Sequence, residues 1–272
     1  MTSPNLQFRF LPYIQFTLFI IINFLFQLQF FNLTFVLLLL ILLTVGFLPE
    51  ENRLFTWITI AFFIGQFCFL YGDRLILNFQ LTREWEIICS RLLLLFPILF
   101  ISFVTFMFKR KILGYPLNAD WNETISLPFQ WHGRFRITMR RFFIFTILLF
   151  TAGFFPFIFE YSASISLYTA SMIVLLTLTN SILESLLWQG ILLTRFSSLS
   201  SEKIAGFFLS VAYGLSHLTI GYSLGACLLF TIQGLFLAYL TVKSFSILPT
   251  ILVHFVFNVF MILSETIPFW VS

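Results

Sequence analysis

Charged residues are scarce in this sequence. Only 10% of its 272 residues are charged, whereas 60% are apolar and the mean hydropathy is +1.00. A soluble domain contains about 25% charged residues, and a chain with so few of them could not cover a water-exposed surface. This scarcity excludes a soluble enzyme, a disordered regulator and a nucleic-acid-binding module. It indicates an integral membrane protein.

Cysteine and aspartate are also rare. The three cysteines, Cys68, Cys89 and Cys227, are far apart and form no CxxC motif, so we expect free buried thiols. The two aspartates, Asp73 and Asp120, lie outside the apolar segments, which excludes the paired aspartates of an aspartyl intramembrane protease. The HExxH motif of many zinc proteases does not occur.

Long apolar runs fill most of the chain. A membrane-spanning helix needs about 20 mostly apolar residues, and polar residues divide the chain into apolar segments of roughly that length. These segments are residues 11–30, 33–48, 54–71, 87–108, 142–159, 167–194, 204–218, 222–240 and 248–263. The first two could also form one tilted span or a re-entrant pair. The predicted fold is therefore an all-α, polytopic integral membrane protein of about eight or nine transmembrane helices.

The lysines and arginines are distributed unevenly between the loops. With a cytoplasmic N-terminus and every segment spanning the membrane, Arg74, Arg83 and Arg91 lie on the far side, and the other basic residues lie on the cytoplasmic side. An excess of cytoplasmic basic residues is the usual topological bias of membrane proteins. The net charge of +4 therefore reflects the membrane and not a nucleic-acid partner. We expect a multi-pass protein of a bacterial plasma membrane or an organellar membrane.

Residues 109–141 form one long loop between the fourth and fifth segments. The loop is rich in basic residues and contains Trp121 and Trp131, which suits an amphipathic segment lying on anionic lipid headgroups. We expect His132, in the same loop, to be an interfacial residue and not a catalytic one. The loop also separates two predicted domains, a divergent N-terminal membrane domain at residues 1–141 and a functional core at residues 142–272.

Four polar residues stand out within the C-terminal apolar segments: Glu184, His217, His254 and Asn258. A charged side chain at the centre of a membrane helix costs roughly 2.5 to 3.5 kcal/mol, so such residues usually have a function. Depth follows from a rise of about 1.5 Å per residue, counted from the nearest cytoplasmic basic residue. On this count Glu184 and His254 lie roughly 16 Å deep, and His217 and Asn258 roughly 21 to 22 Å deep. We therefore expect all four in one layer of the membrane.

His254 and Asn258 are four residues apart and share one face of their helix. This spacing lets both side chains point at one site, together with Glu184 and His217. The alternative interpretation is a set of separate hydrogen bonds between helices, because polar residues commonly hold membrane helices together.

The sequences around these residues resemble the three signatures of one protease family. The runs are ESLLWQG at 184–190, YGLSH at 213–217 and HFVFN at 254–258, in this order on successive segments. Together they are similar to the motifs of the CPBP family of intramembrane proteases, also called the CAAX-protease or ABI family. Its signatures are EExxxR followed by glycine, FxxxH, and HxxxN or HxxxD. The resemblance extends over residues 167–263 and implies a CPBP-like helical core.

The sequence departs from these signatures at three positions. Tyr213 replaces the phenylalanine of the second signature, which keeps an aromatic ring. Ser185 stands where the family has its second glutamate, and Gln189 stands where it has an arginine. Residues four apart on a helix can pair, so the joint loss of an acid and a base leaves no unpaired charge. We expect the core to survive this loss, whereas the rate and the choice of substrate are open.

The resemblance implies an intramembrane endopeptidase. Glu184 and His217 would activate the attacking water, and His254 and Asn258 would donate hydrogen bonds to the oxyanion. The preferred interpretation requires no cofactor. In the alternative, Glu184, His217 and His254 hold a zinc ion with one open position. The expected partners are a membrane-associated protein or peptide as substrate, prenylated CAAX proteins included, and anionic lipid at the basic loop.

Other classes of function remain open. A CPBP-like protein without peptidase activity could bind membrane partners through the same cavity, and the changes at Ser185 and Gln189 favour this alternative. A proton-coupled transporter would use Glu184 and the histidines as a relay, although the segments show no inverted repeat. A rhomboid-type serine protease could pair Ser216 with His254, although GLSH is not the usual GxSG context.

Overall fold

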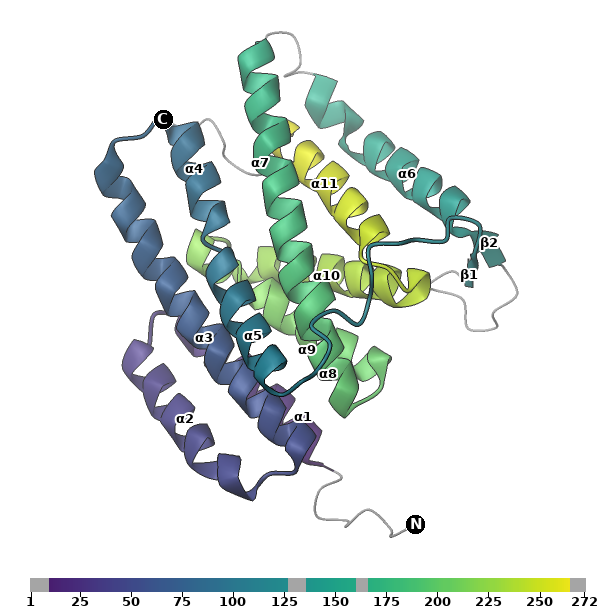
Figure 1. Cartoon of the computed structure of the whole chain (residues 1–272). Coiled ribbons are helices and arrows are strands. Elements are labelled where there is room, and N and C mark those ends of the chain that lie inside the picture. Colours follow the sequence, from purple (N-terminus) through teal and green to yellow (C-terminus); the bar gives the residue numbers. More distant parts are fainter. Residues whose placement is uncertain (1–9, 127–135, 160–165, 265–272) are drawn as a thin grey trace. The chain divides into compact units, whose positions relative to one another are not determined.

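The structure of the chain, a computed structural model, describes residues 10–126, 136–159 and 166–264. Most of the described residues are helical (Figure 1). Helix is the expected state of long apolar segments, because a backbone in lipid must satisfy its hydrogen bonds within the segment itself. Trp131 and His132, which the sequence places in the interfacial loop, lie outside the described residues.

Every predicted apolar segment is helical. The α-helices are α1 (Leu11–Gln27), α2 (Phe31–Thr44), α3 (Glu50–Ile76), α4 (Arg83–Leu92), α5 (Leu95–Met107), α6 (Met139–Phe159), α7 (Leu167–Ser185), α8 (Leu193–Leu199), α9 (Glu202–Leu215), α10 (Leu224–Ser244) and α11 (Leu248–Leu263). The short helical turns are η2 (Val45–Phe47), η3 (Leu77–Phe79) and η6 (Leu218–Ile220), and a π-helix, η5 (Leu186–Leu192), joins α7 to α8. The all-α prediction is confirmed.

Five helical runs among the described residues are long and apolar enough to cross a membrane. They are Glu50–Phe79, Arg83–Met107, Met139–Pro156, Leu167–Leu199 and Leu224–Ser244. The runs Leu11–Gln27, Phe31–Phe47 and Leu248–Leu263 are apolar but shorter. The chain is thus an integral membrane protein, while the number of spans, eight or nine, stays a prediction.

The structure bears on the predictions made for the three cysteines and for Asp73. All three cysteines are free thiols, as predicted, but the predicted burial holds only for Cys227, since Cys68 and Cys89 are half-buried. The expectation that Asp73 lies outside the apolar helices is wrong, because α3 continues past residue 71 to Ile76. The Asp73 carboxylate accepts a hydrogen bond from the Ser90 hydroxyl of α4 at 2.5 Å. This partner satisfies the carboxylate, so the helix can continue through it.

A small β-hairpin interrupts the predicted interfacial loop. Strands β1 (Thr124–Ser126) and β2 (Arg136–Thr138) pair antiparallel, with Ile125 opposite Ile137. Ile125 is buried. Its burial gives the short pair an apolar contact that two isolated strands would lack.

The chain folds as two compact units, and each unit combines separate stretches of sequence. Unit 1 comprises Met1–Gln66, Pro97–Gly114 and Trp188–Tyr239. Unit 2 comprises Phe67–Phe96, Tyr115–Leu187 and Leu240–Ser272. The predicted domain boundary at residue 141 stays a prediction.

Aromatic side chains from distant stretches form the core of unit 1. Phe16 of α1 stacks on Phe196 of α8 with ring centroids 4.5 Å apart, and Phe55 of α3 packs against both rings. Phe62 and Trp188 meet edge to face at 5.6 Å. Each such pair contributes about 0.5 to 1.5 kcal/mol beyond its buried area. These contacts accompany the packing of α1 against α2 and α9, and of α8 against α9.

The helices α4 and α6 pack around α7 and α11 in unit 2. α11 lies against both α7 and α6, and α4 lies against α7 (Figure 1). Ile88 of α4 and Ile262 of α11 pack with three residues of α7 in one buried cluster: Met172, Ile173 and Leu176. This packing sets one face of α11 against α7, the helix in which Glu184 lies.

Candidate active site

The last turns of α7 carry three buried polar residues. Glu184 and Ser185 lie three and four residues after Ser181, so the three side chains share one face of the helix. Their exposed fractions are 0%, 8% and 0%. Ser166 caps the N-terminal end of the helix, because its hydroxyl accepts a hydrogen bond from the Thr169 amide at 3.1 Å. Because the rest of α7 is largely apolar, this polar face is a local feature of its C-terminal end.

α11 presents His254 and Asn258 to the polar face of α7. The Ser185 hydroxyl lies 3.1 Å from Nδ1 of His254, and Nδ2 of Asn258 donates to Oγ of Ser181 at 3.1 Å. As residue numbers rise on α11, their partners' numbers fall on α7, so the two helices run antiparallel. Ser181, Glu184, Ser185, His254 and Asn258 form what we call the α7–α11 cluster. It contains three of the four site residues predicted from the sequence.

The carboxylate of Glu184 and the imidazole of His254 approach each other inside this cluster. Oε2 of Glu184 lies 3.6 Å from Nε2 of His254, and the side chains are 10% and 1% exposed. The separation is longer than a direct hydrogen bond. Hydrogen bonds of catalytic groups are often long in a free enzyme and shorten when the substrate is bound. The arrangement therefore suits an acid–base pair.

The hydrogen bonds around the cluster fix the direction of its donors. The Ser181 hydroxyl donates to the carbonyl oxygen of Thr177 at 2.6 Å, so its oxygen must accept from Asn258. That requirement fixes the orientation of the Asn258 amide. Nε2 of His254 faces the Glu184 carboxylate, which favours a proton on Nε2, and Nδ1 then accepts from the Ser185 hydroxyl. Asn258 and His254 are both hydrogen-bond donors in this arrangement.

His217, the fourth predicted site residue, belongs to unit 1 and follows the C-terminal end of α9. Its Nδ1 lies 2.9 Å from the carbonyl oxygen of Tyr213. Since a carbonyl oxygen only accepts, Nδ1 carries a proton and Nε2 of the neutral ring is an acceptor. The ring stacks on Phe230 at 3.9 Å and meets the Tyr213 ring edge to face at 4.9 Å. Tyr213, at the position of the family's phenylalanine, thus helps to hold the imidazole.

A π-helix follows the cluster directly. The segment Leu186–Leu192 is π-helical, a rare geometry that is frequent at functional sites. Gln189, in the position of the family's arginine, lies within it and is 2% exposed. Its Oε1 has no hydrogen-bond partner among the described residues. The loss of the arginine therefore leaves a buried amide that is not fully paired.

Two contributors to the site, Ser185 and Arg91, were not predicted from the sequence. Ser185 counted there as a loss, whereas its hydroxyl contacts His254. Arg91 counted as a residue of the far-side loops, whereas its Nη1 lies 4.0 Å from Oε1 of Glu184. A signal was present for Arg91, because it lies four residues inside the apolar segment 87–108. No pattern in the sequence pointed to the Ser185 contact.

The zinc alternative requires Glu184, His217 and His254 as ligands. Unit 2 holds Glu184 and His254 close together, and unit 1 holds His217. Within either unit, the described residues contain no group of three histidine, cysteine, aspartate or glutamate side chains that could hold a metal ion. The donors of unit 2 alone therefore do not fit a zinc site, which needs three protein ligands.

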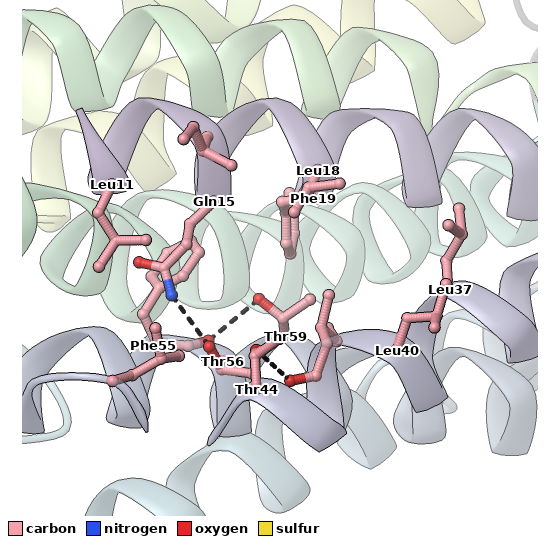
Figure 2. Close-up of a pocket in the computed structure, with 13 residues that line it drawn as sticks. Leu11, Gln15, Leu18, Phe19, Leu37, Leu40, Thr44, Phe55, Thr56 and Thr59 are labelled. Atoms are coloured by element: carbon pink, nitrogen blue, oxygen red, sulfur yellow. Dashed lines mark hydrogen bonds between the residues drawn. The ribbon is translucent and has the colours of Figure 1, made fainter. Parts of the chain in front are cut away.

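Unit 1 contains a separate apolar cavity of about 320 Å³ (Figure 2). Side chains of α1, α2 and α3 line it, and none of them is ionisable. At one end, the Gln15 amide donates to the Thr56 hydroxyl at 2.9 Å. Its lining provides no carboxylate or imidazole, which the predicted chemistry uses to activate water.

Comparison with protein-family models matches residues 166–260 to the family described as type II CAAX prenyl endopeptidase Rce1-like. The matched stretch is about a third of the chain and includes all three motifs read from the sequence. No curated protein and no solved structure matches the chain. The predicted resemblance is thus confirmed for residues 166–260, which are similar to the CAAX-protease family.

Proposed function

We propose that this chain is an intramembrane endopeptidase in which Glu184 is the general base. The observation that carries the proposal is the 3.6 Å approach of the Glu184 carboxylate to the His254 imidazole within the buried α7–α11 cluster. The family match supports a protease as the class of enzyme. The buried position of both side chains agrees with a reaction shielded from bulk water.

In the proposed reaction, Glu184 takes a proton from a water molecule while the water oxygen bonds to the carbonyl carbon of the scissile peptide. The electron pair of the carbonyl double bond moves to its oxygen and forms the oxyanion. When the intermediate collapses, the carbon–nitrogen bond breaks, and the proton held by Glu184 passes to the leaving nitrogen. The products are a carboxylic acid and an amine, and the enzyme returns to its starting state.

His254 and Asn258 are the proposed donors to the oxyanion. Nε2 of His254 carries a proton in the arrangement described, and the Asn258 amide is oriented by its bond to Ser181. Donors that are held in place before the reaction stabilise developing negative charge without reorganising. Removal of one such donor typically lowers kcat about 10²- to 10³-fold.

The role of His217 follows from the motif match and from its protonation. With Nδ1 donating to the Tyr213 carbonyl, Nε2 can accept a proton. We propose that His217 assists Glu184 in activating the water.

The proposed reaction requires no metal. If zinc is bound instead, Glu184, His254 and His217 would be its ligands, and the ion would polarise the water.

The proposed substrate is a membrane-associated protein or peptide. The matched family's description names CAAX prenyl endopeptidases, so prenylated CAAX-type proteins are the first substrates to test. The α7–α11 cluster lies on helices with the composition of membrane segments, which favours a substrate that is itself held at the membrane.

A second candidate is a membrane protein that binds partners without cleaving them. Ser185 and Gln189 favour this alternative, because a neutral hydroxyl and a buried amide replace the family's acid and base. The unpaired Oε1 of Gln189 is a further departure from a fully paired site.

The deciding experiment compares the membrane proteome and peptidome of cells that express the native chain with those of cells that express Glu184→Gln. This substitution keeps the shape of the side chain and removes the base. Glu123→Gln is the matched control, since Glu123 is exposed in the hairpin region of unit 2. A protein that accumulates uncleaved only with Glu184→Gln supports the protease and identifies its substrate. Identical profiles from folded, abundant proteins favour the partner-binding alternative.

A further inference from the structure

Arg91 places a positive charge beside the proposed base. It lies in the last turn of α4, three residues after Ile88, so the two residues share a face of the helix. Ile88 is 4% exposed and packs against α7. The same face therefore directs Arg91 toward α7, where its Nη1 lies 4.0 Å from Oε1 of Glu184.

A nearby positive charge stabilises the ionised form of the buried Glu184 carboxylate. Its side chain is 10% exposed, and a buried carboxylate without a positive partner costs several kcal/mol. The Arg91 guanidinium supplies a positive charge at 4.0 Å from this carboxylate. The two carboxylate oxygens are divided between different neighbours, since Oε1 faces Arg91 and Oε2 faces His254.

We propose that Arg91 is a positioning residue of the active site. Its guanidinium compensates the charge of Glu184 and holds Oε1, so that Oε2 stays turned toward His254. This inference rests on the proposed function of Glu184. Arg91 lies outside the matched residues 166–260, so the charge comes from the part of the chain that the family model does not cover.

A simpler role for Arg91 would be at the C-terminal end of α4. A cation in the last turn of a helix interacts favourably with the helix dipole whatever its neighbours are. Arg74 occupies the same position in α3 and is exposed. Arg74→Gln is therefore the matched control, because it removes the same interaction with a helix end without touching Glu184.

The first test is a double-mutant cycle on thermal unfolding of the full chain in nanodiscs, with Arg91→Gln, Glu184→Gln and the double variant. Arg91→Gln alone is expected to lower the unfolding midpoint by on the order of 5 °C, because the buried Glu184 carboxylate loses a positive charge at 4.0 Å. In the Glu184→Gln background the same change is expected to have little effect. The proposal would be overturned if Arg91→Gln lowered the unfolding midpoint equally in the native and the Glu184→Gln backgrounds. A decrease no larger than that caused by Arg74→Gln would also overturn it. This cycle requires no substrate, so it is independent of whether the chain cleaves peptides.

The second test measures cleavage of the substrate identified with Glu184→Gln. Arg91→Gln is expected to lower kcat about 10- to 100-fold with little change in KM, and Arg91→Lys to recover part of kcat because it keeps the charge. Unchanged kcat for Arg91→Gln would overturn the positioning role. If the native chain itself has no activity, the proposed function fails, while the unfolding cycle still decides whether Arg91 and Glu184 are coupled.

Discussion

The hydroxyl of Ser185 lies 3.1 Å from Nδ1 of His254, and both residues are almost completely buried. Ser185 is the position at which the sequence departs from the family's double glutamate. A hydroxyl can donate to Nδ1, whereas an ionised carboxylate can only accept. The serine therefore favours the imidazole tautomer in which Nε2 carries the proton and faces Glu184.

We expect Ser185→Ala to lower kcat roughly 10- to 100-fold and to leave KM nearly unchanged. The reason is that the hydrogen bond orients His254 and does not itself contact the substrate. Ser185→Thr, which keeps the hydroxyl, should retain more activity than alanine does. The measurement is steady-state cleavage of the substrate in proteoliposomes.

Ser171→Ala is the control for this series, because Ser171 lies on the same helix and is exposed. The tautomer can also be measured directly, from the ¹⁵N chemical shifts of His254 in the native chain and in Ser185→Ala. An unchanged tautomer together with an unchanged kcat would show that Ser185 does not orient the ring.

Asn258→Ala should reduce kcat about 10²- to 10³-fold, since it removes a proposed donor to the oxyanion. It also breaks the bond to Ser181, at a cost of about 1 kcal/mol in the free energy of unfolding. Cleavage kinetics and thermal unfolding, measured on the same preparation, separate the two effects. Asn122→Ala, at an exposed position of unit 2, is the control. A loss of stability without a change in kcat would assign Asn258 a purely structural role.

Removal of metal should leave cleavage unchanged if the proposed reaction is correct. The purified protein would be treated with a strong zinc chelator and assayed, and its metal content would be measured by mass spectrometry before and after treatment. Activity that falls with the zinc content, and returns when zinc is added, would support instead the site formed by Glu184, His217 and His254.

Gly214→Ala should destabilise unit 1 by about 1 to 3 kcal/mol or prevent folding. A Cβ at Gly214 would overlap the Thr231 side chain and lie 2.5 Å from the carbonyl oxygen of Cys227 on α10. Gly206→Ala on the same helix is the control, since its Cβ would be 3.6 Å from Cβ of Ala238, an ordinary contact. Thermal unfolding of both variants tests this prediction. Equal unfolding midpoints for Gly214→Ala and Gly206→Ala would contradict it. Because Gly214 precedes His217 by about one turn, the His217 imidazole should be displaced with it.

The positions of the helices could be predicted from the apolar pattern. The predicted segment 248–263 has the same bounds as α11, and the segment 142–159 differs from α6 only at its start. The physical reason is that an apolar segment in lipid must pair its own backbone groups, which leaves helix as its structure. The sequence also determined that His254 and Asn258 share a face, because a spacing of four residues is a property of the helix itself.

Tertiary structure decided which side chains meet those residues. The partners of Glu184 and His254, namely Arg91 and Ser185, depend on which helices pack together, and hydropathy does not specify helix neighbours. The same limit applies to the hydrogen bond between Asp73 of α3 and Ser90 of α4. The sequence by itself thus determined the membrane class, the helices and the candidate motifs. Only the packing of α4 and α11 against α7 determined how the charge of Glu184 is compensated and how His254 is oriented.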